Sequence, residues 1–467
     1  MQVPDEPTWR RVGDTPQPED LRRQAGSARR RAAALRAGAE AIQASLTEPD
    51  RPDTVDSGLM KQLIEMTTEA EEFFQTQLPR TNAQRYLASR GVDAVAQRLW
   101  GIGYAPDNWR TLTDHLRGRG YDDETIVAGG LAKWRSDRSN IVDLFRHRVV
   151  FPVRDEHGVT RGFVGRAGRG SRTDNSNVKY LNTPDGPIFH KSQILFGLAE
   201  ARAALATGAR PVIVEGPMDA IAVSRAAPLR YAGLALCGIG LSPHHVAALA
   251  RTAPLDTGVL TALDADPAGR AGMIAAYPLL AAISRRTGYG NVDAATLPPR
   301  VDPAEILQTK GPPALVDVLD QTRPLTDLVI DDHVDRWNTN TLEGKTLALR
   351  TTAETLIDMP RHEVARQTAR LAERLELPHW LVVETLADTL IHADDAPKRI
   401  ARRDRDLGGG PGSSFTAPPA HPATAAARTA SPAFPQTIAA TTKQRVSPHS
   451  PSAPGRPAPA RNPSLER

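Results

Sequence analysis

Four acidic residues stand after short apolar runs, at positions where their carboxylates could act together. Glu215 and Asp219 lie in the segment VIVEGPMD, and Asp264 and Asp266 lie in the segment TALDADPAG. Carboxylates that are crowded together repel one another and raise each other's pKa unless a hard cation neutralises them. The four acids therefore predict a site for a divalent cation, with Mg²⁺ or Mn²⁺ as the expected ion.

The elements that would position these acids are three repeats of a strand followed by a helix. Such an alternation predicts right-handed crossovers and one parallel sheet, whose strands all end at the same edge. The acids that follow the strands, and Asp219 in the first turn of a helix, would then converge at that edge. The predicted strands are 212–214, 234–237 and 259–263, and the prolines that would open the helices after them are Pro217, Pro243 and Pro267.

An alternative is that the acids only cap helices. Asp and Glu are favoured at helix starts by the free backbone N–H groups and by the helix dipole, so each acid alone fits this explanation equally well. Four acids on strand-to-helix turns of one sheet are better explained by a shared site. The set, and not any single member, favours metal binding.

The segments around these acids resemble the catalytic core of DnaG-type bacterial primases. EGPMD followed by DADPAG is similar to the metal site of the Toprim fold, and three further blocks match in order along residues 63–390. The resemblance implies a Toprim parallel sheet with flanking helices, a basic mixed α/β lobe before it and a helical subdomain after it. The three further blocks are FRHRVVFPVRDEHGVTRGFVGR, KYLNTPDGPIFHKSQILFGLAEA and VDPAEILQTKG.

The resemblance assigns roles to individual acids. It implies that Glu215, Asp264 and Asp266 are catalytic and hold one or two divalent cations, with Asp219 and Asp302 as further metal ligands. The sequence departs from the family where a second Asp of the last block is Ala304 and where a tyrosine of the first block is Pro217.

The family also carries an N-terminal zinc-binding domain with Cys and His ligands. This chain has one cysteine, Cys237, so no zinc site built on several cysteines and no disulfide is expected. Cys237 falls in the apolar pattern of the predicted strand 234–237, where it is expected to be a small buried side chain.

Basic residues concentrate in a predicted hairpin and in the segment after it. Guanidinium groups match phosphate oxygens in pairs, so this surface predicts contacts with nucleic acid or with a nucleoside triphosphate. The resemblance to primases implies that these partners are single-stranded DNA and ribonucleoside triphosphates. An ordinary solvated surface is the alternative, because aromatic residues that could belong to a core are interleaved with the charges. The residues expected to bind nucleic acid or nucleotide are Arg146, Arg148, Arg166, Lys179, Tyr180 and Lys191.

Composition sets the class of protein. An apolar share of 40% is enough for buried cores, and the net charge of +4 favours an anionic partner only weakly. The first residues lack the basic and apolar regions of a secretion signal, and nowhere do eighteen apolar residues run together. A cytoplasmic protein that does not bind membranes is therefore expected.

Five segments are predicted along the chain. A basic helical segment with a linker comes first, and a tail rich in Pro and Ala, expected to be disordered, comes last. The segments are 1–56 (basic helix and linker), 57–205 (basic α/β lobe), 206–323 (Toprim domain), 324–395 (helical subdomain) and 396–467 (tail).

The predicted function is synthesis of short RNA primers on single-stranded DNA by a metal-dependent primase. A replicative helicase is a further candidate partner. Two alternatives remain open. One is a Toprim nuclease or strand-passage enzyme that uses the same acids on a phosphodiester. The other is a catalytically silent DNA-binding accessory protein of a mobile element, which Ala304 and the shortage of cysteines would favour.

Overall fold

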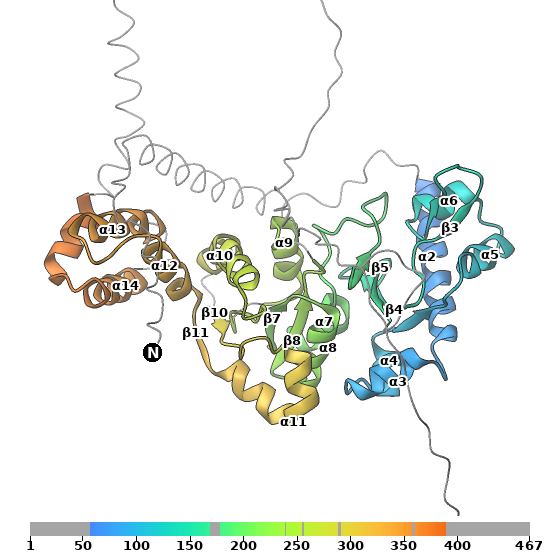
Figure 1. Cartoon of the computed structure of the whole chain (residues 1–467), viewed down its shortest axis with the longest axis horizontal. Coiled ribbons are helices and arrows are strands. Elements are labelled where there is room, and N and C mark those ends of the chain that lie inside the picture. The colour runs from blue at the N-terminus through green and yellow to red at the C-terminus, as the bar shows by residue number, and fades with distance from the viewer. Residues whose placement is uncertain are drawn as a thin grey trace, which may run out of the picture. The chain divides into compact units, whose positions relative to one another are not determined.

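The structure is a computed structural model, and it describes residues 57–388 apart from 169–177, 239, 255, 288–290, 357, 358, 360 and a few side chains. The predicted basic N-terminal helix and the predicted tail lie outside the described residues. Within them, the order of elements is that of an α/β protein with helices at its C-terminal end (Figure 1). No described helix has the length and apolar character that crossing a membrane requires.

The N-terminal part is built on a four-stranded antiparallel sheet, in the order β1-β4-β5-β6. β4 and β5 form the hairpin predicted from sequence, with the turn at Asp155–Gly158 closed by a backbone hydrogen bond. The strands of this sheet are β1 (Gly103–Ala105), β4 (Arg148–Arg154), β5 (Thr160–Ala167) and β6 (Tyr180–Asn182), and a small pair is formed by β2 (Ala132–Trp134) and β3 (Ile141–Asp143).

Helices pack on this sheet through aromatic residues. Phe74 meets Phe163 edge to face, with ring centroids 5.3 Å apart, and Phe145 completes the cluster. Gly103 lies so close to the backbone of Phe74 that a Cβ there would overlap it, which explains why the first strand carries a glycine. The helices are α2 (Ser57–Gln77), α3 (Asn82–Ser89), α4 (Ala94–Leu99), α5 (Thr111–Gly118) and α6 (Asp123–Ala128).

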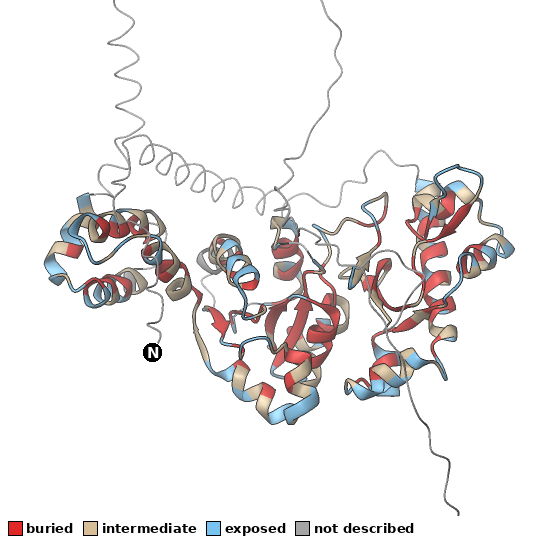
Figure 2. Cartoon of the chain, in the orientation of Figure 1, coloured by how far each residue is buried: buried red, intermediate tan, exposed pale blue. Residues whose placement is uncertain are grey.

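The second sheet has five strands in the order β11-β10-β9-β7-β8. Three of its four strand pairings are parallel, and the pairing of the edge strand β11 with β10 is antiparallel. Figure 2 shows its central strands buried, which agrees with the uninterrupted apolar runs in their sequences. The strands are β7 (Arg210–Val214), β8 (Tyr231–Ala235), β9 (Val259–Thr261), β10 (Val292–Ala295) and β11 (Thr322–Pro324).

Helices connect the parallel strands as the sequence predicts. Pro217, Pro243 and Pro267 each open a helix, and Ser242 caps the second of them through a hydrogen bond from the His245 N–H. A proline suits this position because its missing N–H would have no partner there anyway. The helices around the sheet are α7 (Leu198–Ala206), α8 (Pro217–Ala226), α9 (Pro243–Thr252), α10 (Pro267–Thr287) and α11 (Pro303–Asp320).

Two strand predictions were wrong by a few residues: β9 ends at Thr261 instead of at residue 263, and β8 lies earlier than the predicted 234–237. β8 ends at Ala235, and Cys237 lies in the following turn with a positive φ of 55°. The residue as a whole is only partly buried, although burial of its thiol raises the pKa to about 12. The apolar run continues past the strand because Leu236 still packs into the core, so hydrophobicity alone did not mark the strand end.

A single hydrophobic cluster joins parts of the chain that the sequence assigned to different domains. Leu87, Val92 and Trp100, from α3, α4 and their flanks, belong to the same cluster as Met218 of α8 and Leu319 of α11. The predicted boundary at 205/206 therefore does not separate two independent cores.

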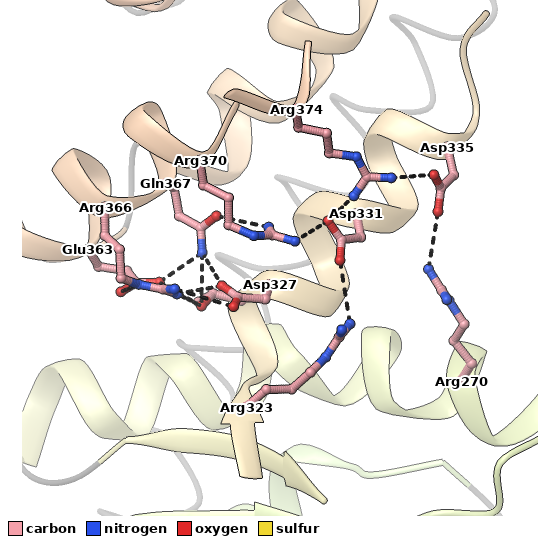
Figure 3. Close-up of polar contacts among 11 residues, drawn as sticks. Arg270, Arg323, Asp327, Asp331, Asp335, Glu363, Arg366, Gln367, Arg370 and Arg374 are labelled. Carbon is pink, nitrogen blue, oxygen red and sulfur yellow. Dashed lines mark hydrogen bonds and ion pairs between the residues drawn. The ribbon is translucent and has the colours of Figure 1, made fainter. Parts of the chain in front are cut away.

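Ion pairs as well as apolar contacts hold the helices of the helical subdomain together and link them to β11. Arg370 and Arg374 both pair with Asp331, and Arg374 also pairs with Asp335 at 2.5 Å (Figure 3). Asp331 is buried and also lies 3.5 Å from Arg323 of β11, so one carboxylate links three guanidinium groups. The helices are α12 (Leu325–Asp335), α13 (Leu342–Leu356) and α14 (Arg361–Arg374).

Candidate metal centre

Glu215 stands at the carboxyl end of β7. Three buried β-branched residues precede it and Gly216 follows it, so the strand ends where the carboxylate becomes exposed. Its Oε1 accepts a hydrogen bond of 3.2 Å from the backbone N–H of Asp264, which follows the adjacent strand β9. The structure thus brings together two acids that are 49 residues apart, as the parallel sheet predicts.

Asp264 and Asp266 occupy the turn between β9 and α10. Asp266 caps the start of α10, because its Oδ1 accepts a 2.8 Å hydrogen bond from the Gly269 N–H. A Cβ at position 269 would overlap the carbonyl oxygen of Asp264. Gly269 therefore allows the first turn of α10 to approach the end of β9 closely.

Asp219 and Asp302 form the other half of the acidic cluster. Asp219 is buried in the first turn of α8, and its Oδ1 accepts a 3.3 Å hydrogen bond from the backbone N–H of Ala304. Asp302 caps α11 through a 2.6 Å hydrogen bond from the Glu305 N–H and lies 3.5 Å from Arg90. Ala304 itself is buried, so the position at which the family carries an Asp is here part of the packing.

Of the four acids for which capping was the alternative, Asp266 does cap a helix, and so does Asp302. Each uses one carboxylate oxygen for the cap. The N-terminus of α8 has no side-chain cap, and Glu215 bonds to a neighbouring strand end, so capping does not account for Glu215 or Asp219.

The acids affect one another electrostatically. Burial is the main cause that raises the pKa of Asp219, to about 7, and the charge of Asp302 is the next cause. Burial and the charges of Asp302 and Asp266 raise the pKa of Asp264, and burial and the charge of Asp264 raise that of Glu215. Lys179 opposes all three shifts.

This donor set fits a hard divalent cation in its chemistry, because carboxylate oxygens are the preferred ligands and a cation would relieve the mutual repulsion. Within the described part of the chain, no three His, Cys, Asp or Glu side chains form a ready-made cluster for an ion. Asp219 and Asp302 are both hydrogen-bonded to backbone N–H groups of α11.

Three of the predicted nucleic-acid-binding residues lie beside the acids. The guanidinium of Arg166 lies 5.8 Å from the ring centroid of Tyr180, and the Lys179 amine lies 5.6 Å from the same ring. A Cβ on Gly216 would be 3.6 Å from the hydroxyl of Tyr180, which places this tyrosine next to the turn that carries Glu215. Burial raises the pKa of Tyr180, so its hydroxyl stays protonated.

Two other predicted residues turn inward instead. Arg148 is fully buried and donates hydrogen bonds to the carbonyl oxygens of Gly165 and Val178, at 3.0 and 3.2 Å. Arg146 is also buried, and its guanidinium lies 4.1 Å from the ring centroid of Trp109. Arg148 lies on β4 and satisfies carbonyl oxygens around the hairpin, whereas Arg146 lies before that strand and donates to the carbonyl oxygen of Asp143.

For Lys191, the described contacts are made by the backbone. Its N–H donates to Asp185 at 2.9 Å, and its carbonyl oxygen is bonded to His245 at 2.8 Å. Sequence reasoning missed Tyr86 on α3 and Arg90 directly after it. The Arg166 guanidinium lies 4.8 Å from the Tyr86 ring, and Arg90 reaches Asp302. No spacing in the sequence signals either contact, because both join segments far apart in the chain.

Comparison with known proteins agrees with this arrangement. Residues 73–202 match the family described as the DNA primase catalytic core, N-terminal domain, and residues 212–307 match the Toprim-like family. The DNA primase of Streptomyces coelicolor is 32% identical over 376 residues, which cover 77% of this chain and 56% of that protein. The DNA primases of Neisseria meningitidis are also 32% identical, over 71% of this chain and 53% of theirs.

Solved structures show the same similarity. A DNA primase domain from Pseudomonas aeruginosa aligns with a TM-score of 0.58 and 29% identity, covering 70% of this chain and 99% of that one. The RNA polymerase domain of Mycobacterium tuberculosis DnaG, solved with double-stranded DNA, aligns with a TM-score of 0.56 and 28% identity, covering 68% and 99%. A DnaG primase catalytic domain bound to single-stranded DNA aligns with a TM-score of 0.58 and 26% identity, covering 69% and 98%.

The chain spans about half the length of the curated relatives that it matches. The matched part contains both domains of the core, in the same order, and the acids described above lie in its Toprim domain or directly beside it. Toprim domains typically bind divalent metal. The chain therefore belongs to the DnaG-type DNA primase family, of which it carries the catalytic core with the Toprim domain.

Proposed function

We propose that this protein synthesises RNA primers on single-stranded DNA from ribonucleoside triphosphates, using Mg²⁺ or Mn²⁺. The observation that carries the proposal is the convergence of Glu215, Asp264 and Asp219 beside the basic residue Lys179, within a core of the primase family. Carboxylates next to a lysine and an arginine suit a reaction between two polyanions, because the charges of the substrates and of the site must both be neutralised.

In the proposed reaction, the 3′-hydroxyl of the growing strand attacks the α-phosphorus of the incoming triphosphate. A new phosphodiester bond forms, and the bond to the leaving pyrophosphate breaks. Glu215, Asp264 and Asp266 would hold the divalent cations, with Asp219 and Asp302 as further ligands. Such ions lower the pKa of the attacking hydroxyl and neutralise the charge that develops on the triphosphate.

The chain's own residues would orient the substrates. Lys179 is exposed beside the acids, so it can approach phosphate oxygens. The guanidinium of Arg166 lies 4.8 Å from the Tyr86 ring centroid and 5.8 Å from that of Tyr180, and contacts with two rings would limit its movement. A guanidinium fixed in this way loses less conformational entropy when it binds a phosphate. Lys191 is proposed as a further contact, and a replicative helicase in the cytoplasm as a partner of the whole protein.

The test is primer synthesis on labelled single-stranded DNA with ribonucleotides and Mg²⁺. We expect Glu215→Gln and Asp264→Asn to abolish synthesis without changing the fold, because each removes a charge with little change in volume. Asp137→Asn is the matched control, since Asp137 is an exposed acid in the turn between β2 and β3. Near wild-type synthesis by both site variants would refute the proposed centre.

The same assay separates the alternatives. A Toprim nuclease would shorten the labelled DNA in a reaction that needs Glu215 but no ribonucleotides. A catalytically silent DNA-binding protein would retain the DNA without changing its length or extending a primer. Elongation products that require ribonucleotides and Asp264 would exclude both.

A further inference from the structure

The second half of the acidic cluster is contacted by a residue from outside the Toprim domain. Arg90 caps the C-terminal end of α3, and its Nη2 lies 3.5 Å from Oδ1 of Asp302. The two side chains are 19% and 29% exposed, so the pair is largely removed from solvent. Such a pair constrains a carboxylate more than a surface pair does.

The backbone holds Arg90 in place. Its N–H donates to the carbonyl oxygens of Tyr86 and Leu87, both at 3.0 Å, and the chain then reverses at Gly91, which has a φ of 77°. A positive φ of this size favours glycine, so the turn after α3 is defined by the sequence. Arg90 therefore projects from a rigid point and not from a loose loop.

Two helices of the Toprim domain, α8 and α11, contact the same turn through polar side chains. Gln308 of α11 donates a 2.7 Å hydrogen bond to the carbonyl oxygen of Ser89. Arg225 of α8 donates to the carbonyl oxygen of Gly91 and pairs with Asp93 at 2.9 Å. The turn between α3 and α4 is thus fixed to α8, whose first turn carries Asp219, and to α11, which Asp302 caps.

The contacts of Asp302 are unevenly divided between its oxygens. Oδ1 accepts the hydrogen bond from the Glu305 N–H and faces Arg90. Among the residues that the structure describes, no hydrogen bond reaches Oδ2. Next to Asp302, the N–H of Ala304 is bonded to Asp219, so the first turn of α11 touches both acids.

We propose that Arg90 is a positioning residue for Asp302, through which the turn between α3 and α4 sets the second half of the metal site. By engaging Oδ1, Arg90 leaves Oδ2 directed for use as a ligand. The proposal rests on the proposed function of Asp302 as a metal ligand. Arg90 acts through Asp302 and does not itself touch the substrate or the metal.

The sign of one measurement separates this role from a simple effect of charge. Removing a guanidinium near a cation site lowers the local positive potential, so Coulomb's law alone predicts tighter binding of a cation. Loss of a residue that orients a ligand predicts weaker binding, by about 10-fold to 100-fold for a typical outer contact. The two explanations therefore predict changes in opposite directions.

The experiment is titration of the full chain with Mn²⁺, followed by electron paramagnetic resonance, without DNA or nucleotide. We expect Arg90→Ala to weaken Mn²⁺ binding about 10-fold. Arg85→Ala is the control, because Arg85 is exposed on α3 and its side chain bonds only to Asn82 within the described contacts. Unchanged or tighter binding by Arg90→Ala, or an equal loss in Arg85→Ala, would overturn the proposal.

A second comparison tests whether Arg90 acts through Asp302. If it does, Arg90→Ala has no further effect on Mn²⁺ binding in a chain that already carries Asp302→Asn, whereas independent effects would add. Circular dichroism checks that each variant is folded, and Arg90→Gln, which keeps most of the side chain's length, replaces Arg90→Ala if the latter is not. Full additivity would contradict the proposal.

The Mn²⁺ titration also distinguishes a failure of the proposed metal centre from a failure of the positioning role of Arg90. If the wild-type chain binds no Mn²⁺, or if Glu215→Gln binds it as well as the wild type, the metal centre itself is wrong. If Glu215→Gln loses binding and Arg90→Ala does not, only the positioning role fails.

Discussion

Asp219 gives the sharpest test of the electrostatics of the site. In the folded chain its carboxyl is buried, and burial together with the charge of Asp302 raises its pKa from 3.8 to about 7. A carboxyl with a higher pKa in the folded state binds its proton more tightly there than in the unfolded chain. The free energy of unfolding therefore falls as the pH rises from about 4 to about 7, and the full loss persists above pH 7.

The size of this loss follows from the change in pKa. A pKa shift of one unit corresponds to about 1.4 kcal/mol, so the ionised Asp219 lowers the free energy of unfolding by up to about 4 kcal/mol at pH 8. Water that reaches the ionised group reduces this figure, and we expect Asp219→Asn to stabilise the metal-free chain by about 2–4 kcal/mol at pH 8. Below pH 4 the two chains should have similar stability, because both side chains are then neutral.

The assay is urea unfolding in the presence of a chelator, at pH 8 and at the lowest pH at which the chain stays folded. Asp266→Asn is the matched control, since Asp266 is exposed and its loss is expected to change the free energy of unfolding by only about 0.5 kcal/mol. With Mg²⁺ at about 100 times its Kd, the free energy of unfolding of the wild type should rise by about 2.7 kcal/mol, and that of Asp219→Asn should rise by less. If Asp219→Asn is no more stable than the wild type at pH 8, the reasoning about this buried charge is wrong.

Three further predictions concern the surroundings of the site. Gly269→Ala should lower primer synthesis at least about 10-fold, because its Cβ would displace the turn that carries Asp264, whereas Gly118→Ala, with open space around it, should have little effect. Asp331→Ala should lower the free energy of unfolding by about 1–3 kcal/mol, because Arg370 and Arg374 lose their shared partner. Asp332→Ala, which breaks one exposed pair with Arg336, should cost only about 0.5 kcal/mol, and equal losses in urea unfolding would argue against the network in α12 and α14. Burial lowers the pKa of His245 to about 4, so between pH 7 and pH 5 only the unfolded chain takes up a proton at this residue. The free energy of unfolding of the wild type should therefore fall by about 2 kcal/mol more than that of His245→Gln over this range. Equal falls in the two chains, measured by urea unfolding, would contradict this burial.

The sequence predicted the strand ends that carry Glu215 and Asp264 because local signals were strong there. A β-branched run, Gly216 and Pro217 mark the turn after β7, and an apolar run and Pro267 mark the turn after β9, although β9 itself ends at Thr261. The parallel arrangement then places the acids at one edge. The antiparallel edge strand β11 is only three residues long, and its pairing with β10 depends on packing rather than on pattern.

Side-chain direction was less predictable than element type. Arg148 lies on a strand that is buried on both faces, so its charge points into the protein and is satisfied by carbonyl oxygens. A sequence shows that a strand is basic but not which of its faces meets solvent. Contacts such as that of Arg90 with Asp302 were also out of reach, because they join residues more than two hundred positions apart.

The shared hydrophobic cluster around α3, α4 and α8 limits how this core can be rearranged. A chimera joined at residue 206 would receive Met218 and Leu319 without Leu87 and Trp100, which belong to the same cluster. The incoming part would then expose apolar surface, and so would the part left behind, which favours aggregation during folding. Exchange of the Toprim domain between relatives should therefore succeed only when the segment from Thr81 to Trp100 is transferred with it or already matches it.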